Sequence, residues 1–192
     1  MRRHPPRDSD LIDALEACAP ISLKQSLWRV VRDKRDPCQC SKPGGRWDDE
    51  SVEVLYTAHE RNGALAEMHF HLRKGQPVIP PKIKYRLHEL QSNLENVLDL
   101  SDRSLLTDLG VDMAKFGQMT YVNKDHEYVR TQIIGETANF LGFNGILVPN
   151  ARWNCNNIVL FCDSLAPDQL DEREDHGIVD WKSWEKETED TR

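Results

Sequence analysis

Glu67 has a carboxylate that can stabilise a positive charge, and it lies with Arg46 and Tyr56 around one predicted strand-to-helix turn. Tyr56 lies near the end of a β-like run at 52–58, and Glu67 follows eleven positions later, about two turns into a predicted helix. On a helical wheel, Glu67 lies about 60° to the side of the apolar stripe of that helix. A carboxylate on the flank of a buried face, near an aromatic ring and a guanidinium, can stabilise a short-lived cation.

A strand followed by a helix must position these side chains. The sequence predicts a strand at 52–58 and a helix at 60–73, and an upstream strand at 27–31 that carries Trp28 and Arg29. Further strands are predicted at 83–90, 96–100, 145–148 and 157–162, and further helices at 10–19, 101–109 and 125–141. Because strands and helices alternate irregularly and without repeats, we predict a single compact α+β domain.

Length and composition restrict the class of protein. The 192 residues suffice for one substantial domain, and the sequence contains neither an apolar run long enough for a transmembrane helix nor a secretory signal. Five cysteines form no CxxC pair, and Cys38 and Cys40 have no partner pair that would complete a zinc site. We therefore expect reduced thiols, no bound metal and a cytoplasmic location.

The net charge of −7 is concentrated at the C-terminal end. Residues 163–192 hold eleven acidic and four basic residues, so the rest of the chain is neutral overall. This balance argues against direct nucleic-acid binding, which needs clustered Lys and Arg. We predict an N-terminal segment at 1–21, a domain at 22–163 and an acidic tail at 164–192. The tail is either solvated or forms a short helix that docks, through a face with Trp181 and Trp184, on this domain or on a partner.

Each candidate residue also has a structural interpretation. Arg29 can form an ion pair on its strand, Tyr56 can belong to the core, and Glu67 can pair with a neighbour on its helix. The sequence contains no GxxxxGK[ST] phosphate loop, no HExxH metal helix and no GxSxG nucleophile elbow. Taken alone, these residues predict an α+β domain and leave its activity open.

Five blocks of the sequence resemble the RES-domain family in their order and spacing, over roughly residues 22–163. The blocks are Leu27-Trp28-Arg29-Val30, Gly45-Arg46-Trp47, Val54-Leu55-Tyr56-Thr57-Ala58, Ala64-Leu65-Ala66-Glu67, and Gly145-Ile146-Leu147-Val148-Pro149-Asn150-Ala151-Arg152 with Asn157-Ile158-Val159-Leu160-Phe161. The resemblance implies a fold like that of the ADP-ribosyltransferases. It also implies a toxin that consumes NAD+ by phosphorolysis or hydrolysis, with no cofactor beyond NAD+ as its substrate.

The resemblance also implies roles for individual residues. Arg29 and Arg46 are expected to line the NAD+ pocket, Tyr56 to pack on the nicotinamide ring, and Glu67 to be the catalytic carboxylate, assisted by Arg46 and Tyr56. Asn150 stands where the family usually has serine. Because asparagine keeps a hydrogen-bond donor and an acceptor, Asn150 is expected to bind the ribose or a phosphate of NAD+.

The expected partner is an antitoxin with an Xre-type helix-turn-helix that occludes the pocket. Two other functions stay open, namely an ADP-ribosyltransferase that modifies a protein and a non-catalytic binding module. The sequence does not select between water, phosphate and a protein side chain as the acceptor. It also leaves open a homodimer.

Overall fold

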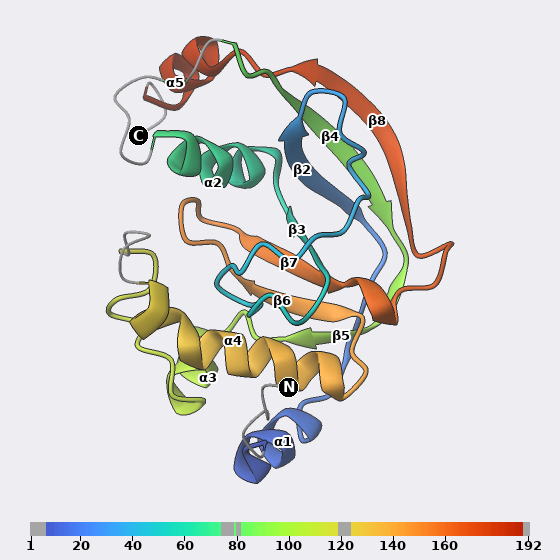
Figure 1. The fold of residues 1–192 in the computed structure, drawn as a ribbon, viewed down its shortest axis with the longest axis vertical. Coiled ribbons are helices and arrows are strands. Elements are labelled where there is room, and N and C mark those ends of the chain that lie inside the picture. Colours follow the sequence, from blue (N-terminus) through green and yellow to red (C-terminus); the bar gives the residue numbers. More distant parts are fainter. Residues whose placement is uncertain (1–6, 74–78, 80–81, 119–123, 190–192) are drawn as a thin grey trace.

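A curled, mixed sheet of eight strands forms the centre of the computed structural model, which describes residues 7–73, 79, 82–118 and 124–189 (Figure 1). The strand order is β1-β5-β6-β7-β3-β2-β4-β8, with β5 and β6 parallel and the other neighbours antiparallel. The strands are β1 (Ile21–Leu23), β2 (Ser26–Arg32), β3 (Val54–Ala58), β4 (Tyr85–Ser92), β5 (Leu94–Asp99), β6 (Gly145–Pro149), β7 (Asn156–Phe161) and β8 (Leu170–Ile178). The helices are α1 (Ser9–Glu16), α2 (Arg61–Arg73), α3 (Arg103–Asp108), α4 (Lys124–Phe140) and α5 (Trp181–Glu189), with a 3-10 turn at Cys162–Ser164.

Alternation along β7 divides the core between the two faces of the sheet. Val159 and Phe161 pack into a cluster with residues of α1, α3 and α4, whereas Ile158 and Leu160 belong to a cluster on the opposite face. Because successive side chains of a strand point to opposite faces, an apolar run buried on both sides is expected at the centre of a sheet. β7 therefore anchors the sheet between two apolar layers.

The sheet splits between β2 and β3. Within the described residues the two strands pair at a single position, where Trp28 lies opposite Ala58. On its other side, β2 pairs with β4 along its whole length, and β3 pairs with β7 in the same way. The two halves of the sheet thus diverge beyond Trp28, and the segment at 33–53 connects them across the opening.

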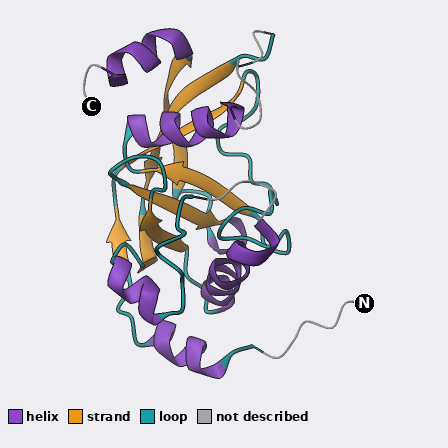
Figure 2. Ribbon diagram, turned by 90° about the vertical axis from the view of Figure 1, so that its left-hand side faces the viewer, coloured by secondary structure: helices purple, strands orange, loops and turns teal. Residues whose placement is uncertain are grey.

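Helices gather at both ends of this divided sheet, with α2 and α5 at one end and α1, α3 and α4 at the other (Figures 1 and 2). α5 docks on α2, where Trp184 donates a hydrogen bond from Nε1 to Asn62 Oδ1 at 3.2 Å. The His69 ring lies 5.1 Å from the ring of Trp184, and its Nε2 lies 2.6 Å from Glu185 Oε1. Of the two alternatives for the C-terminal end, the structure therefore favours the docked helix.

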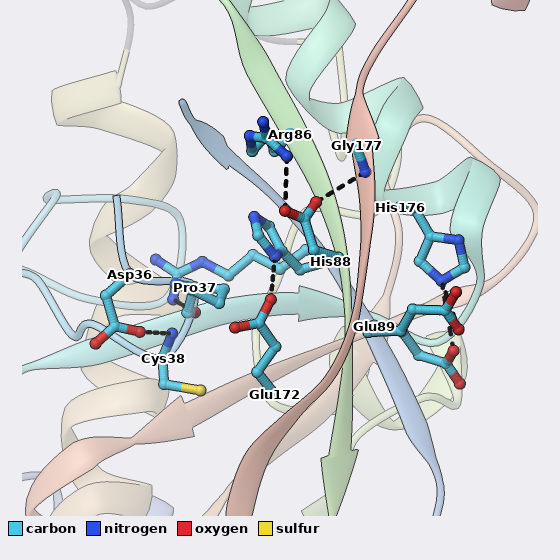
Figure 3. Close-up of polar contacts among 12 residues, drawn as sticks. Asp36, Pro37, Cys38, Arg86, His88, Glu89, Glu172, His176 and Gly177 are labelled. Atoms are coloured by element: carbon cyan, nitrogen blue, oxygen red, sulfur yellow. Dashed lines mark hydrogen bonds and ion pairs between the residues drawn. The ribbon is translucent and has the colours of Figure 1, made fainter. Parts of the chain in front are cut away.

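β8 is an edge strand that lies within the segment predicted to be an acidic tail. Its acidic side chains pair with the neighbouring β4, where His88 Nδ1 lies 2.6 Å from Glu172 Oε1 (Figure 3). Arg86 makes a further ion pair with Asp175 at 2.6 Å. Partly exposed pairs contribute at most about 1 kcal/mol each, so the backbone ladder with β4 is the main attachment. The sheet thus continues past residue 163.

The expectation of five reduced thiols is wrong for two of them. Cys40 and Cys162 form a disulfide, whereas Cys18, Cys38 and Cys155 are free. Cys40 belongs to the loop between β2 and β3, and Cys162 directly follows β7, so the bond fastens this loop to the sheet. Their separation of 122 residues explains why the sequence did not indicate the pairing.

Among the described residues, no helix combines the length and the apolar character needed to cross a bilayer.

Loss of the disulfide should lower the thermal stability of the protein. Closing a loop of 122 residues restricts the unfolded chain, so Cys40→Ser should cost roughly 2–4 kcal/mol of unfolding free energy. Cys18→Ser is the matched control, since Cys18 is a free thiol on α1's C-terminal side. Melting temperatures measured with and without dithiothreitol give the result. An identical melting temperature for wild type and Cys40→Ser without reductant would contradict the prediction.

Candidate active site

A cavity of about 430 Å³ opens where β2 and β3 diverge. Its walls come from these two strands, from α2, from the loop that follows β2, and from the turn between β6 and β7. Four of the five predicted site residues line it together, namely Arg29, Arg46, Tyr56 and Glu67. The fifth, Asn150, is the first residue of the turn between β6 and β7 and is 3% exposed.

Glu67 is the carboxylate that α2 brings to the cavity. Its Oε1 accepts hydrogen bonds from the backbone N–H of Ala151 at 3.1 Å and from Asn157 Nδ2 at 3.3 Å. α2 lies close to the turn between β6 and β7 because Gly63 has no side chain, and a Cβ there would lie 2.4 Å from Cys155 Sγ. The carboxylate is therefore held by hydrogen-bond donors of the turn and of β7, and not by groups of its own helix.

The hydroxyl of Tyr56 is held by a buried aspartate, Asp48. Its hydroxyl donates to Asp48 Oδ1 at 2.7 Å and accepts from the backbone N–H of Trp47 at 3.0 Å. Asp48 is fully buried and also accepts from the N–H groups of Gly44 and Gly45, both at 2.8 Å. Burial, together with the charge of Asp48 and the hydrogen bond to it, raises the pKa of Tyr56 well above its usual value. The hydroxyl is thus neutral and makes two hydrogen bonds, which fix the orientation of the ring in the cavity wall.

Arg46 lines the cavity and contacts two aromatic rings. Its guanidinium carbon is 4.5 Å from the ring centre of Phe116 and 4.9 Å from that of Tyr128, both within the range of cation–π contacts. The backbone on either side is tied to α4, because Gln132 Nε2 donates to the carbonyl of Gly45 at 2.8 Å. Arg46 therefore comes from a loop that the adjacent helix holds in place.

Arg29 extends from β2 toward the loop that spans the opening. Its Nη1 donates to the carbonyl oxygens of Pro37 at 2.7 Å and of Gln39 at 3.2 Å. Burial, with a contribution from the charge of Arg35, lowers the pKa of Arg29 to about 10. The side chain is still a cation at neutral pH, and a bound anion would relieve its desolvation.

Arg152 is the third arginine of the wall and comes from the turn between β6 and β7. Its guanidinium carbon lies 3.4 Å from the ring centre of Phe70, and its Nη1 donates to the carbonyl of Gly117. The arginine thus connects α2 with the segment that precedes α4.

Asn150 organises the turn that carries Ala151 and Arg152. Its Oδ1 accepts from the N–H groups of Arg152 at 2.7 Å and Trp153 at 2.9 Å. Its Nδ2 donates to Asn157 Oδ1 at 2.7 Å and to the carbonyl of Gly63 at 3.4 Å. These four bonds use both acceptor sites and both donors of the amide. Asn150 is therefore engaged with the protein on every side, which is a different arrangement from the ligand-binding position expected from the sequence.

Two residues of the site were not identified from the sequence. One is Asp48, which follows Arg46 and Trp47 in the sequence. An aspartate three residues after a glycine in a polar loop can accept hydrogen bonds from backbone N–H groups of that loop, and this spacing was the available signal. Asn157 was included as the first residue of a predicted strand and of a block that resembles the family, without a role at the site. A polar residue at the start of an otherwise apolar run is a weak signal, because it is also typical of an exposed strand end.

The cavity combines an excess of positive charge with one fixed carboxylate. The arginines can hold an anionic group such as a pyrophosphate, and the ring of Tyr56 offers a flat apolar surface. Glu67 supplies negative charge at the wall formed by α2 and the turn. Such a site suits a reaction in which positive charge develops on a substrate that also carries phosphates.

The chain is similar to known proteins in sequence and in fold. The profile of the RES domain matches residues 26–182. The MbcT–MbcA toxin–antitoxin complex of M. tuberculosis contains a chain of the same fold, with 21% sequence identity and a TM-score of 0.75. That match covers 93% of this chain and 97% of the other. A comparison with curated proteins found no match. The likeness confirms the predicted single α+β domain.

Tyr56→Phe should separate the hydroxyl from the ring in its effect on stability. The variant keeps the aromatic surface but removes a donor from buried Asp48, so the free energy of unfolding should fall by about 1–3 kcal/mol near pH 8. The raised pKa of Tyr56 in the folded state means that its stabilising effect is complete below about pH 10 and is lost as the pH rises further. The difference between wild type and variant, measured by urea unfolding, should therefore shrink above pH 10. A difference that is constant from pH 8 to pH 11 would contradict this assignment.

Proposed function

Because the chain belongs to the RES-domain family, with the match covering residues 26–182, we propose that it cleaves NAD+ at the bond between nicotinamide and ribose. The observation that carries this proposal is the position of Glu67, whose carboxylate is fixed in a cavity lined by three arginines and by Tyr56. A volume of about 430 Å³ is within the range of roughly 300–1,000 Å³ that is usual for small-molecule sites.

Cleavage of this bond develops a positive charge on the ribose, which the Glu67 carboxylate can stabilise in the proposed complex. The electron pair of the glycosidic bond leaves with the nicotinamide nitrogen, which becomes neutral, and positive charge develops on the ribose. The Glu67 carboxylate stabilises that charge and directs an acceptor to the anomeric carbon. With water as the acceptor the products are ADP-ribose, nicotinamide and a proton. With phosphate as the acceptor they are ADP-ribose 1-phosphate and nicotinamide.

The other residues of the cavity bind and orient the substrate. Tyr56 packs on the nicotinamide ring, and its hydroxyl stays protonated against Asp48. Arg29 and Arg46 hold the pyrophosphate, and we assign Arg152 to the same positive wall. Holding the remote phosphates supplies binding energy that positions the reacting bond.

The biological role that we infer is growth arrest by depletion of NAD+. The structure of MbcT is that of a toxin–antitoxin complex with MbcA, and a comparable antitoxin, expected to be of the Xre type, is our inferred partner for this chain. An antitoxin that occludes the cavity would exclude NAD+ from Glu67.

The proposal is tested by incubating the purified chain with NAD+, with and without inorganic phosphate, and measuring the release of nicotinamide. Glu67→Gln keeps the shape of the side chain and removes its charge, so turnover should fall on the order of 10²-fold or more. Glu95→Gln is the matched control, since this glutamate is an exposed residue of β5 paired with Lys24.

The outcomes distinguish three activities. Release that requires phosphate identifies a phosphorylase, and release without phosphate identifies a glycohydrolase. If no nicotinamide is released from folded protein that is free of antitoxin, or if Glu67→Gln is as active as wild type, the proposal is wrong. Mass spectrometry that detects ADP-ribose on cellular proteins would support the transferase alternative instead.

A further inference from the structure

Both hydrogen bonds to the Glu67 carboxylate are made to the same oxygen. Oε1 accepts from the N–H of Ala151 and from Asn157 Nδ2, and among the described residues no hydrogen bond is made to Oε2. The backbone donor belongs to the turn after β6, and the amide donor to the first residues of β7. The carboxylate is therefore held at one oxygen by two different elements of the sheet.

Asn157 is itself fixed in one orientation. Its Oδ1 accepts from Asn150 Nδ2 at 2.7 Å, so the opposite end of the amide, Nδ2, must point to Glu67. Asn150 cannot rotate without breaking bonds, because its own amide makes four hydrogen bonds with the turn, with Gly63 and with Asn157. A chain of two fixed amides thus runs from the buried Asn150 through Asn157 to the carboxylate.

The backbone of β7 places Asn157 where this contact is possible. Its Cα pairs with Ala58 of β3 on one side and with Val148 of β6 on the other, so it lies inside the sheet next to the split. Asn157 lines the cavity together with Glu67. A strand interior is a rigid support, and a site held by such elements is more precisely positioned than one held by a loop.

We propose that Asn157, oriented by Asn150, is a positioning residue that fixes Oε1 of Glu67 and so presents Oε2 to the ribose of the substrate. This inference rests on the proposed cleavage of NAD+ and adds to it the residue that determines which carboxylate oxygen meets the developing cation. The amide does not touch the reacting atoms; it acts through Glu67.

The decisive variant is Asn157→Asp, which has nearly the same shape. Its carboxylate can still accept from Asn150, but the group that faces Glu67 changes from a donor to an anion, and the two carboxylates repel each other. Displacement of a catalytic group by about 1 Å can cost on the order of 10²-fold in rate. We therefore expect kcat to fall about 10- to 100-fold with KM changed less than about twofold.

A second comparison separates positioning from a merely structural role. If Asn157 acts through Glu67, Asn157→Asp should change kcat less than about twofold when Glu67 is already replaced by Gln. If Asn157 only supports the fold, the loss should be similar in both backgrounds, and that result would overturn the inference. Asn96→Asp serves as the control, since Asn96 is a β5 asparagine whose amide bonds to the carbonyl of Gly142.

A measurement without turnover keeps the inference separate from the proposed activity. In 15N–1H spectra of the folded chain without NAD+, the side-chain amide signal of Asn157, identified by its loss in Asn157→Asp, should shift when Glu67 becomes Gln. An unchanged signal would show that the amide does not contact this carboxylate and would overturn the inference. A shifted signal with no release of nicotinamide by wild type would support the contact and refute the NAD+ cleavage.

Discussion

The single paired position between β2 and β3, Trp28 opposite Ala58, is the constraint on which the rest of the molecule depends. A continuous ladder would fill the space between the strands with backbone hydrogen bonds and would leave no room for a ligand. Because the ladder stops, each half of the sheet needs its own support, which β4 supplies to β2 and β7 supplies to β3. The cavity is therefore a property of the sheet, and side chains at its rim determine the chemistry.

A split sheet leaves backbone and side-chain polar groups that need hydrogen-bond partners. Two buried side chains, the carboxylate of Asp48 and the amide of Asn150, supply such partners. Asp48 gathers the N–H groups of Gly44 and Gly45 and the hydroxyl of Tyr56, so the loop that crosses the opening folds around one anion. A buried charge without partners would be costly, whereas three donors make it a fixed point. A Cβ at residue 45 would lie 2.6 Å from the Tyr56 hydroxyl, which explains why a glycine is required there.

The parts of the molecule that the sequence predicts are those with a strong local signal. The apolar run of β7 and the strand-to-helix step from β3 to α2 have such signals, and both elements lie close to their predicted bounds. β8 has none, because its residues 171–176 are exposed and charged, and the strand is defined by pairing with β4. The Cys40–Cys162 bond and the role of Asn150 likewise depend on residues brought together by the fold. The residue types of Arg46, Tyr56 and Glu67 led to the predicted chemistry of the site. Asp48 and Asn157, which support them, belong to no periodic pattern and were therefore not identified.

The residues that support the site differ from those proposed to act on the substrate, and this division has a physical reason. Catalysis by electrostatic stabilisation requires that charges be oriented before the transition state forms, so that no free energy is spent on reorienting them. Glu67 on a helix flank has rotamer freedom of its own, and that freedom is removed from outside the helix by the turn at Ala151 and by β7. Tyr56 is restrained in the same way by Asp48. In both cases a polar partner from another element converts a flexible side chain into a fixed dipole or charge, which is the property that the proposed cleavage through a developing cation demands.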